Sequence, residues 1–245
     1  MTPTPVGMRC PECARQKTKV TRGAVGAGRY DAPATYALIA INVAAFLVEI
    51  ATGSGGFGRA TGPVIEDFAL QGVAVADGEW YRLLTGGFLH ASLFHIGFNM
   101  FALYILGRML EPGIGTPRFV ALYFASLFAG SFGALLLSDP VAVTVGASGA
   151  VFGLFGAAFL IARRRGLDAI ASQLGFLLAI NLALTFVLPR LSVGGHLGGL
   201  AGGLLCAAII VAGERGQLGR NRLPLEIAAM TAVAVAAILG ALAVA

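Results

Sequence analysis

The chain has 245 residues, of which 57% are hydrophobic and only 12% are charged, and it contains 35 glycines. Together with a mean hydropathy of +0.83, this composition excludes an ordinary soluble domain and predicts an all-α protein that crosses a membrane several times. The formal net charge of +5 is explained by the positively charged cytoplasmic loops of such a protein. We therefore expect no nucleic-acid partner.

Apolar windows of about 17 to 25 residues, long enough to cross the hydrocarbon, can be drawn seven times along the chain. They lie at 34–51, 90–110, 118–138, 147–162, 168–188, 194–212 and 224–244. The expected organisation is a tail over 1–33, a core of six spans over 34–212 with an outside loop at 52–89, and a linker with the seventh span over 213–245. Because the tail precedes the first window, we do not expect a cleavable signal peptide there. The segments between these windows are too short to form a soluble catalytic domain.

Lysine and arginine are distributed unevenly between the two sides of these spans. Of the 17 in the chain, only Arg59, Arg82 and Arg190 fall on one side, and the remaining fourteen fall on the other. Positively charged loops stay in the cytoplasm. The sequence therefore predicts a multi-pass protein of the cell membrane, with a cytoplasmic N-terminus, the loop 52–89 outside and the C-terminus outside.

The tail contains Cys10 and Cys13 in "CPEC", which has the spacing of one half of a zinc site. A closed structural zinc site needs four ligands, and the chain has no second pair of this kind. We therefore expect no bound metal and no other cofactor. The third cysteine, Cys206, lies inside the sixth span and is interpreted as a small packing residue.

The second span begins with polar side chains in "HASLFHIGFN". Groups that ionise or hydrogen-bond are costly in the bilayer, so each is a functional candidate. His90, nearest the water, is interpreted as a histidine at a helix end. His95 and Asn99 are four residues apart and therefore share one helix face. His95 falls at the outer end of the bundle in the predicted orientation, and Asn99 lies one turn deeper.

The fourth span opens with "GASGAVFG", in which Ser148 lies among small residues. Small residues at four-residue spacing are routine where membrane helices pack closely, so packing alone is one interpretation of this serine. The alternative is a nucleophile. The sixth span supplies a matching glycine face and His196 in "GGHLGGLAGG", again at the outer end. Close helix axes are what a serine–histidine hydrogen bond of roughly 2.6–3.2 Å requires.

A serine hydroxyl becomes a useful nucleophile when a base removes its proton, and histidine suits this near neutral pH. We therefore expect Ser148 as nucleophile and His196 as general base. No acidic residue falls well inside a span near them, so we expect a dyad. The oxyanion would be met by the Ser148 backbone N–H near the helix N-terminus, with His95 and Asn99 as side-chain donors.

At these residues the sequence resembles rhomboid intramembrane serine proteases. The resemblance rests on "GASG", "GGHLGGLAGG" and "HASLFHIGFN", and on the arginine of "EWYRLLTGGFLH", in the family's order over residues 80–205. It implies a six-helix core whose fourth helix begins at the serine, with the seventh span as the added C-terminal helix of the six-plus-one form. It also implies the Ser148–His196 dyad, oxyanion binding by His95 and Asn99, and a structural role for Arg82 in the outer loop.

The chain departs from the family pattern at three places. The family's loop motif is Trp-Arg, whereas here Tyr81 stands between Trp80 and Arg82. The tyrosine that often stacks on the catalytic histidine in bacterial members is replaced by Phe152, which keeps the ring. The N-terminal "PVGMRCPECARQ" resembles the end of a cysteine-rich extension found in some actinobacterial members, so the start of the chain is interpreted as truncated or decayed.

The resemblance implies single-pass membrane proteins as substrates, cleaved near the outer surface, with the lipid bilayer as the surrounding partner. Two other functions remain open at this point. Non-proteolytic relatives bind membrane clients but lack the serine, the histidine or both. A small transporter would gather polar residues near the midplane, often with internal repeats, and this chain shows neither pattern. The fifth span, with bulky Phe176, Leu177 and Phe186 and only Gly175 as a small contact, is expected to pack loosely and to open for substrates.

Overall fold

The structure is a computed structural model, and it describes residues 2–4, 7–9, 31–54, 61–188, 191–216 and 222–245. The chain divides into two units, residues 1–30 and residues 31–245. In the first unit, strands β1 (Thr2–Thr4) and β2 (Gly7–Arg9) form an antiparallel pair. Cys10 and Cys13 lie outside the described residues, so the statement about zinc stays a prediction.

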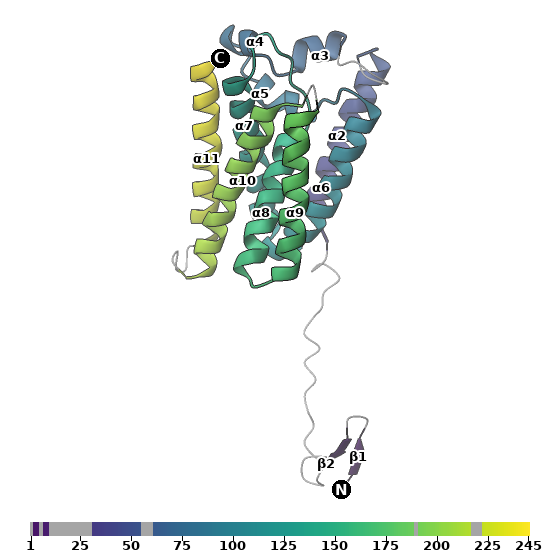
Figure 1. The fold of residues 1–245 in the computed structure, drawn as a ribbon, viewed down its shortest axis with the longest axis vertical. Helices are drawn as coiled ribbons and strands as arrows, with labels where there is room; N and C mark the ends of the chain where they lie inside the picture. The colour runs from purple at the N-terminus through teal and green to yellow at the C-terminus, as the bar shows by residue number, and fades with distance from the viewer. Residues whose placement is uncertain (1, 5–6, 10–30, 55–60, 189–190, 217–221) are drawn as a thin grey trace. The chain divides into compact units, whose positions relative to one another are not determined.

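The second unit is a bundle of long helices (Figure 1). They are α2 (Pro33–Ala51), α6 (Leu93–Ile114), α7 (Thr116–Leu137), α8 (Ser148–Arg164), α9 (Asp168–Val187), α10 (Val193–Glu214) and α11 (Arg222–Val244). Among the described residues, six of these helices are long and apolar enough to cross a membrane, and α8 is shorter at 17 residues. Each of these seven helices coincides with one predicted window. The expected all-α polytopic membrane fold is thereby confirmed.

The second span differs most from its predicted window. Helix α6 begins at Leu93, three residues later than expected, because the hydroxyl of Ser92 caps it by accepting the His95 backbone N–H at 3.2 Å. His90 therefore lies in the preceding loop and is fully buried. At its other end α6 continues to Ile114, and the buried Glu111 near that end accepts hydrogen bonds from the first turn of α2, including the Thr35 N–H at 2.9 Å.

The loop over residues 52–89, which is predicted to lie outside and is called the outside loop below, contains local structure that hydropathy does not reveal. It forms the short helices α3 (Pro63–Phe68), α4 (Gly72–Ala76) and α5 (Arg82–Thr85), followed by a 3₁₀ turn, η2 (Gly86–Phe88). Figure 1 shows these elements grouped at one end of the bundle, the end at which α8 and α10 begin. This loop therefore covers the end of the bundle that carries the predicted site.

Glycine contacts join α7, α8 and α10 at the centre of the bundle. A Cβ atom on Gly199 would overlap the carbonyl oxygen of Gly149, and one on Gly203 would overlap that of Gly153. On the opposite side, a Cβ on Gly198 would overlap the Ala129 carbonyl of α7. The prediction that glycine faces bring the fourth and sixth spans together is confirmed by these contacts.

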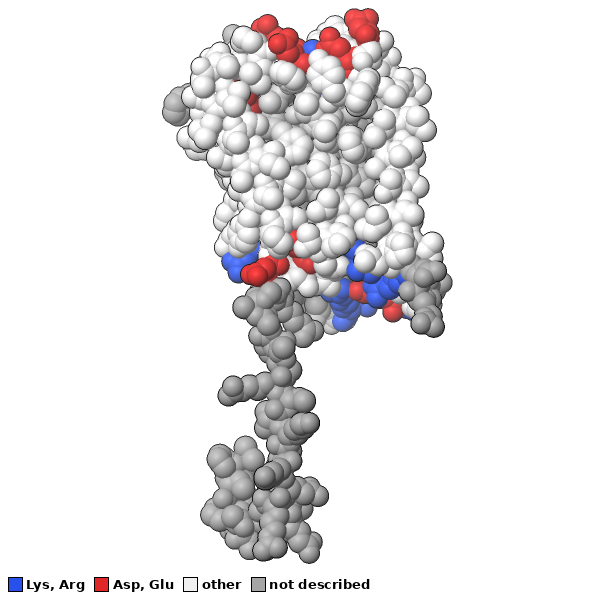
Figure 2. Space-filling model, turned by 180° about the vertical axis from the view of Figure 1, so that it is seen from behind, with Lys and Arg blue, Asp and Glu red and all other residues white. Residues whose placement is uncertain are grey.

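Charge is concentrated at the two ends of the bundle. Figure 2 shows a broad uncharged band, with mostly red acidic residues above it and with blue arginines together with further acidic residues below it. The lower end is tied together by the buried Glu226 of α11, which pairs with Arg118 of α7 and with Arg222 at 2.8 Å. The uncharged band is the surface that a hydrocarbon core would contact.

Candidate active site

Ser148 is the first residue of α8. The segment that leads into this helix contains Gly146, a position at which no other residue type fits. Gly146 has φ +126°, in the left-handed region, and a Cβ there would lie 2.6 Å from Cε1 of His95. The Gly146 N–H donates to the Gly86 carbonyl at 2.9 Å, which fixes the approach to the helix. The Ser148 N–H is one of the first amides of α8, which have no acceptor within the helix.

His196 lies in the first turn of α10 and faces Ser148. Its Nε2 is 2.9 Å from the Ser148 Oγ, within the range of a hydrogen bond. Ser148 is half-buried, whereas His196 is buried. The glycine contacts between α8 and α10 permit this distance, since a bulkier pair of helix faces would hold the two backbones further apart.

Thr185 of α9 completes the hydrogen bonding of His196. Its Oγ1 is 2.7 Å from His196 Nδ1, and the same hydroxyl donates to the Asn181 carbonyl at 2.9 Å. A hydroxyl has one hydrogen, so Thr185 accepts from Nδ1–H while it donates to the carbonyl. In this tautomer Nε2 carries the lone pair, which is the state needed to accept the Ser148 proton.

Thr185 was not predicted from the sequence. It is buried, with 2% of its surface exposed. The only sequence signal for it is a threonine at membrane depth in "NLALTFVL", where a hydroxyl commonly bonds the carbonyl four residues earlier. That local bond exists here, but the second contact with His196 comes from tertiary structure.

Phe152 lies one turn after Ser148 and stacks on the imidazole of His196. The two rings are 4.1 Å apart between centroids, with an angle of 14° between their planes. The ring therefore restricts rotation of His196 from one face, while Thr185 and Ser148 hold its two nitrogens. The phenylalanine expected to replace the family's tyrosine occupies this stacking position.

His95 and Asn99 lie on the same face of α6, beside the entrance to α8. The His95 Nδ1 accepts the Ala91 N–H at 3.4 Å, which leaves Nε2 as the N–H donor on the side of Gly146. Asn99 donates one amide hydrogen to the His95 carbonyl at 2.9 Å, so its second amide hydrogen remains for another acceptor. The ring of His90 packs edge-on against His95 at 5.1 Å.

The loop before α6 is fixed by buried charged groups. Glu49 at the end of α2 accepts the His90 N–H at 3.1 and 3.2 Å. Arg82 donates to the carbonyls of Glu66 at 2.7 Å and Ala69 at 2.9 Å, and pairs with Glu79 at 2.5 Å. The hydrogen bond from Arg82 holds the pKa of Glu79 below its usual range. Arg82 thus joins three parts of the outside loop and forms no hydrogen bond with Ser148 or His196.

A small cavity adjoins the serine. It has a volume of about 30 Å³ and is lined by Ser148, Gly149, Thr144, Ser131 and Ser192, among others. One water molecule needs about 10–15 Å³ of cavity volume, so this cavity has room for two water molecules. Among the residues that the structure describes, no cluster of three histidines, cysteines or acidic residues is arranged to hold a metal.

Comparison with known proteins gives a consistent family assignment. The model of the Rhomboid domain matches residues 77–213. Rhomboid protease GluP of Bacillus subtilis (strain 168) is 34% identical over 193 residues, which are 77% of this chain and 37% of that protein. Putative rhomboid protease YdcA of the same organism is 35% identical over 57% of this chain and 71% of its own length. RHOMBOID-like protein 1 of Arabidopsis thaliana is 37% identical, over 35% of its length. The chain therefore spans little more than a third of two of these three relatives.

Proposed function

Because the chain belongs to the rhomboid family, we propose that it is an intramembrane serine endopeptidase working through the Ser148–His196 dyad. The observation that carries the proposal is the 2.9 Å contact between Ser148 Oγ and His196 Nε2, together with the Thr185 contact on Nδ1. A packing role for Ser148 accounts for the neighbouring glycines but gives no reason for a buried histidine in this tautomer. The named proteases among the relatives support the same reaction.

In the proposed reaction, Ser148 Oγ attacks the carbonyl carbon of the substrate peptide bond while His196 Nε2 takes its proton. The tetrahedral intermediate collapses with breakage of the C–N bond, and the histidine gives its proton to the leaving amine. Water, with His196 again as base, then attacks the acyl-enzyme and releases the carboxylic acid and the free serine. Thr185 keeps the imidazole in the productive tautomer through both halves of this cycle.

The negative charge on the intermediate's oxygen would be met by three donors. They are the Ser148 backbone N–H at the start of α8, the His95 Nε2–H and the free amide hydrogen of Asn99. Donors fixed in advance within a low-dielectric site stabilise a developing charge without reorganisation. Gly146 supports this arrangement because its missing side chain lets the His95 ring lie against the backbone two residues before Ser148.

The substrates we propose are single-pass membrane proteins, cut near the outer face of the membrane. The basic end of the bundle in Figure 2 would lie in the cytoplasm by the positive-inside rule, which places Ser148 toward the outside. Helix α9 is the proposed point of entry. Within its membrane window only 17% of residues are buried, and its buried side chains are Ala171, Leu174 and Thr185.

The direct test uses purified full-length protein in neutral detergent with a reporter that contains one transmembrane helix. We expect a single cut near one end of that helix, and no cut by Ser148→Ala, which fits the same small-residue face. A fluorophosphonate probe should label the wild type and leave Ser148→Ala unlabelled. Cleavage by Ser148→Ala at a few per cent of the wild-type rate would remove Ser148 from the mechanism.

A further inference from the structure

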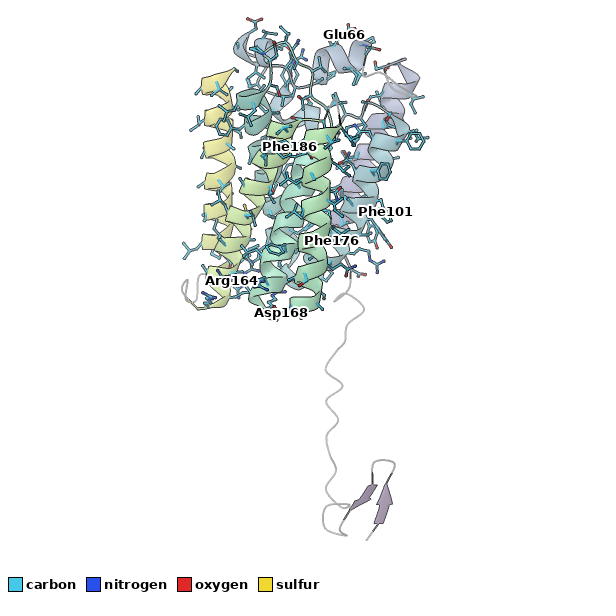
Figure 3. The ribbon with its side chains drawn as sticks, viewed as in Figure 1. Glu66, Phe101, Arg164, Asp168, Phe176 and Phe186 are labelled. Carbon is cyan, nitrogen blue, oxygen red and sulfur yellow. The ribbon has the colours of Figure 1, made fainter. Side chains whose placement is uncertain are left out.

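The end of the bundle opposite the dyad contains a hollow between α8 and α10. It has a volume of about 150 Å³ and is lined by Leu160, Arg164, Ala208, Val211, Ala212 and Arg215. Arg164 is the last residue of α8, sixteen residues after Ser148, so the hollow is about 24 Å from the serine along the helix axis. Figure 3 shows Arg164 at the lower end of the bundle, far from Glu66 of the outside loop.

The two arginines of the hollow differ from their neighbours in how their charge is balanced. Three carboxylates at this end pair with other arginines: Glu214 with Arg165 at 2.5 Å, Asp168 with Arg163 at 3.5 Å, and Glu226 with Arg118 and Arg222. Within the described part of the chain, neither Arg164 nor Arg215 forms an ion pair. Two positive charges therefore face one hollow without a counter-ion from the described residues.

The walls of the hollow change from charged to apolar along the helix axes. Leu160 lies one turn before Arg164 on α8, and Val211 and Ala208 lie one and two turns before Arg215 on α10. The alanines leave the groove open, since Ala208 is exposed and Ala212 half-buried. The ligand that matches this surface has an anionic head beside the arginines and an apolar chain running toward the bilayer centre.

We propose that this hollow binds the phosphate of an anionic phospholipid, with an acyl chain against Leu160, Ala208 and Val211. The planar guanidinium matches phosphate oxygens in a bidentate geometry, and basic pockets between membrane helices recognise anionic head groups. The volume is about ten times that required by one water, which suits a phosphodiester. Helix C-termini favour cations on their own, but that preference does not account for the hollow or its apolar wall.

The test measures lipid retention by native mass spectrometry on the purified full chain, and it is independent of proteolysis. We expect the wild type to retain phosphatidylglycerol in preference to phosphatidylcholine. The double variant Arg164→Gln/Arg215→Gln should weaken phosphatidylglycerol binding by about fivefold for each arginine removed. The matched control, Arg108→Gln/Arg163→Gln, removes the same charge from exposed arginines outside the hollow and should bind as the wild type does.

A second variant keeps both arginines. Ala208→Trp fills the apolar wall at an exposed position, where the fold tolerates a larger side chain, and it should weaken phosphatidylglycerol binding as strongly as the double variant. Unchanged binding by Ala208→Trp, or equal losses in the two arginine double variants, would overturn the proposal in favour of general surface charge. Competition by inorganic phosphate as effective as that by the lipid would assign the site to a free anion and overturn the lipid assignment.

Discussion

Thr185 Oγ1 and His196 Nδ1 lie 2.7 Å apart, and this contact joins α9 to the helix that carries the histidine. Helix α9 packs mainly on α8 and only lightly on α10, so the hydrogen bond is one of few links between α9 and α10. The side chain of Thr185 thus connects the proposed dyad to the proposed entry helix. Movement of α9 would change the hydrogen bonding of His196.

Replacing Thr185 by Val removes the hydroxyl and keeps the shape, so the fold should be retained. Without an acceptor for Nδ1–H, the imidazole populates both tautomers and loses its fixed orientation. We expect kcat to fall by about 10- to 100-fold, less than the roughly 10⁴-fold loss when a buried carboxylate partner of a catalytic histidine becomes an amide. The measurement is kcat with a saturating transmembrane reporter.

Thr185→Ser provides the matched control for that experiment. It restores the hydroxyl without the methyl group, and it should recover most of the rate. A structural role would instead make Val the better substitute, because it preserves packing. Equal rates for Thr185→Val and the wild type would show that His196 needs no partner on Nδ1.

Removing His196 should be as damaging as removing Ser148. In the proposed mechanism the two residues act as a unit, so either loss abolishes activation of the nucleophile and the effects do not add. His196→Ala, Ser148→Ala and the double variant are expected to share the same residual rate. A double variant much slower than both single variants would mean that the two side chains act in separate steps.

Asn99→Ala should have a milder effect. One dominant oxyanion donor is worth on the order of 10²–10³ in rate. In the proposed mechanism Asn99 binds the oxyanion together with His95 and the Ser148 N–H. Its hydrogen bond to the His95 carbonyl at 2.9 Å engages one of its two amide hydrogens. The turnover of Asn99→Ala at saturating reporter is the measurement, and an unchanged turnover would remove Asn99 from the mechanism.

The spans and the candidate dyad could be predicted from the sequence because each leaves a clear pattern in it. Long apolar windows identify membrane helices, and a bilayer leaves few reasons for a buried His196. The sequence predicts the start of α6 three residues early, because the apolar window begins before Ser92. The Ser92 cap that sets the true start depends on local backbone geometry, which hydropathy does not reveal.

Thr185 and the short helices of the outside loop could not be predicted in the same way. The hydroxyl of a threonine in an apolar span can donate to the carbonyl four residues earlier in its own helix. Its sequence context therefore does not distinguish a hydroxyl that also binds His196 from one that bonds only within its helix. Helices α3 and α5 are held by tertiary contacts, such as those from Arg82 to the Glu66 and Ala69 carbonyls. Such contacts leave no periodic signal in the chain.

The pair of Glu79 and Arg82 makes a pH-dependent contribution to the outside loop. Arg82 holds the pKa of Glu79 below its usual range in the folded state. The stabilisation is therefore present above the unfolded carboxyl pKa of about 4.3 and is lost as pH falls through the lower folded value. Glu79→Gln should lower thermal stability at pH 7 and make it less sensitive to acid below about pH 4.

Glu66→Gln is the control for the acid titration, since Glu66 is an exposed carboxylate of the same loop. Its side chain can change while its backbone carbonyl still accepts from Arg82. We expect its melting temperature to follow the wild type over the whole pH range. If Glu79→Gln and the wild type lost stability in parallel below pH 4, the pair would not be the source of the acid sensitivity.

The last prediction concerns α9 as the entry point for substrates. Phe176 and Phe186, two of the bulky residues of this span, are 65% and 63% exposed and therefore do not hold the helix against its neighbours. Leu174, which is 7% exposed, is the large apolar side chain that α9 buries. Leu174→Ala should therefore loosen α9, whereas the exposed Phe176→Ala should have little effect on it (Figure 3).

If opening of α9 limits turnover, as lid motions often do, Leu174→Ala should speed cleavage of a transmembrane reporter. Weakening the closed state by about 1 kcal/mol would raise the open population about fivefold. A short soluble peptide needs no lateral opening, so its cleavage should not accelerate. The same loosening weakens the contact between Thr185 and His196, and the peptide rate should fall slightly for that reason. A transmembrane reporter cut no faster by Leu174→Ala, with the peptide rate also unchanged, would place substrate entry away from α9.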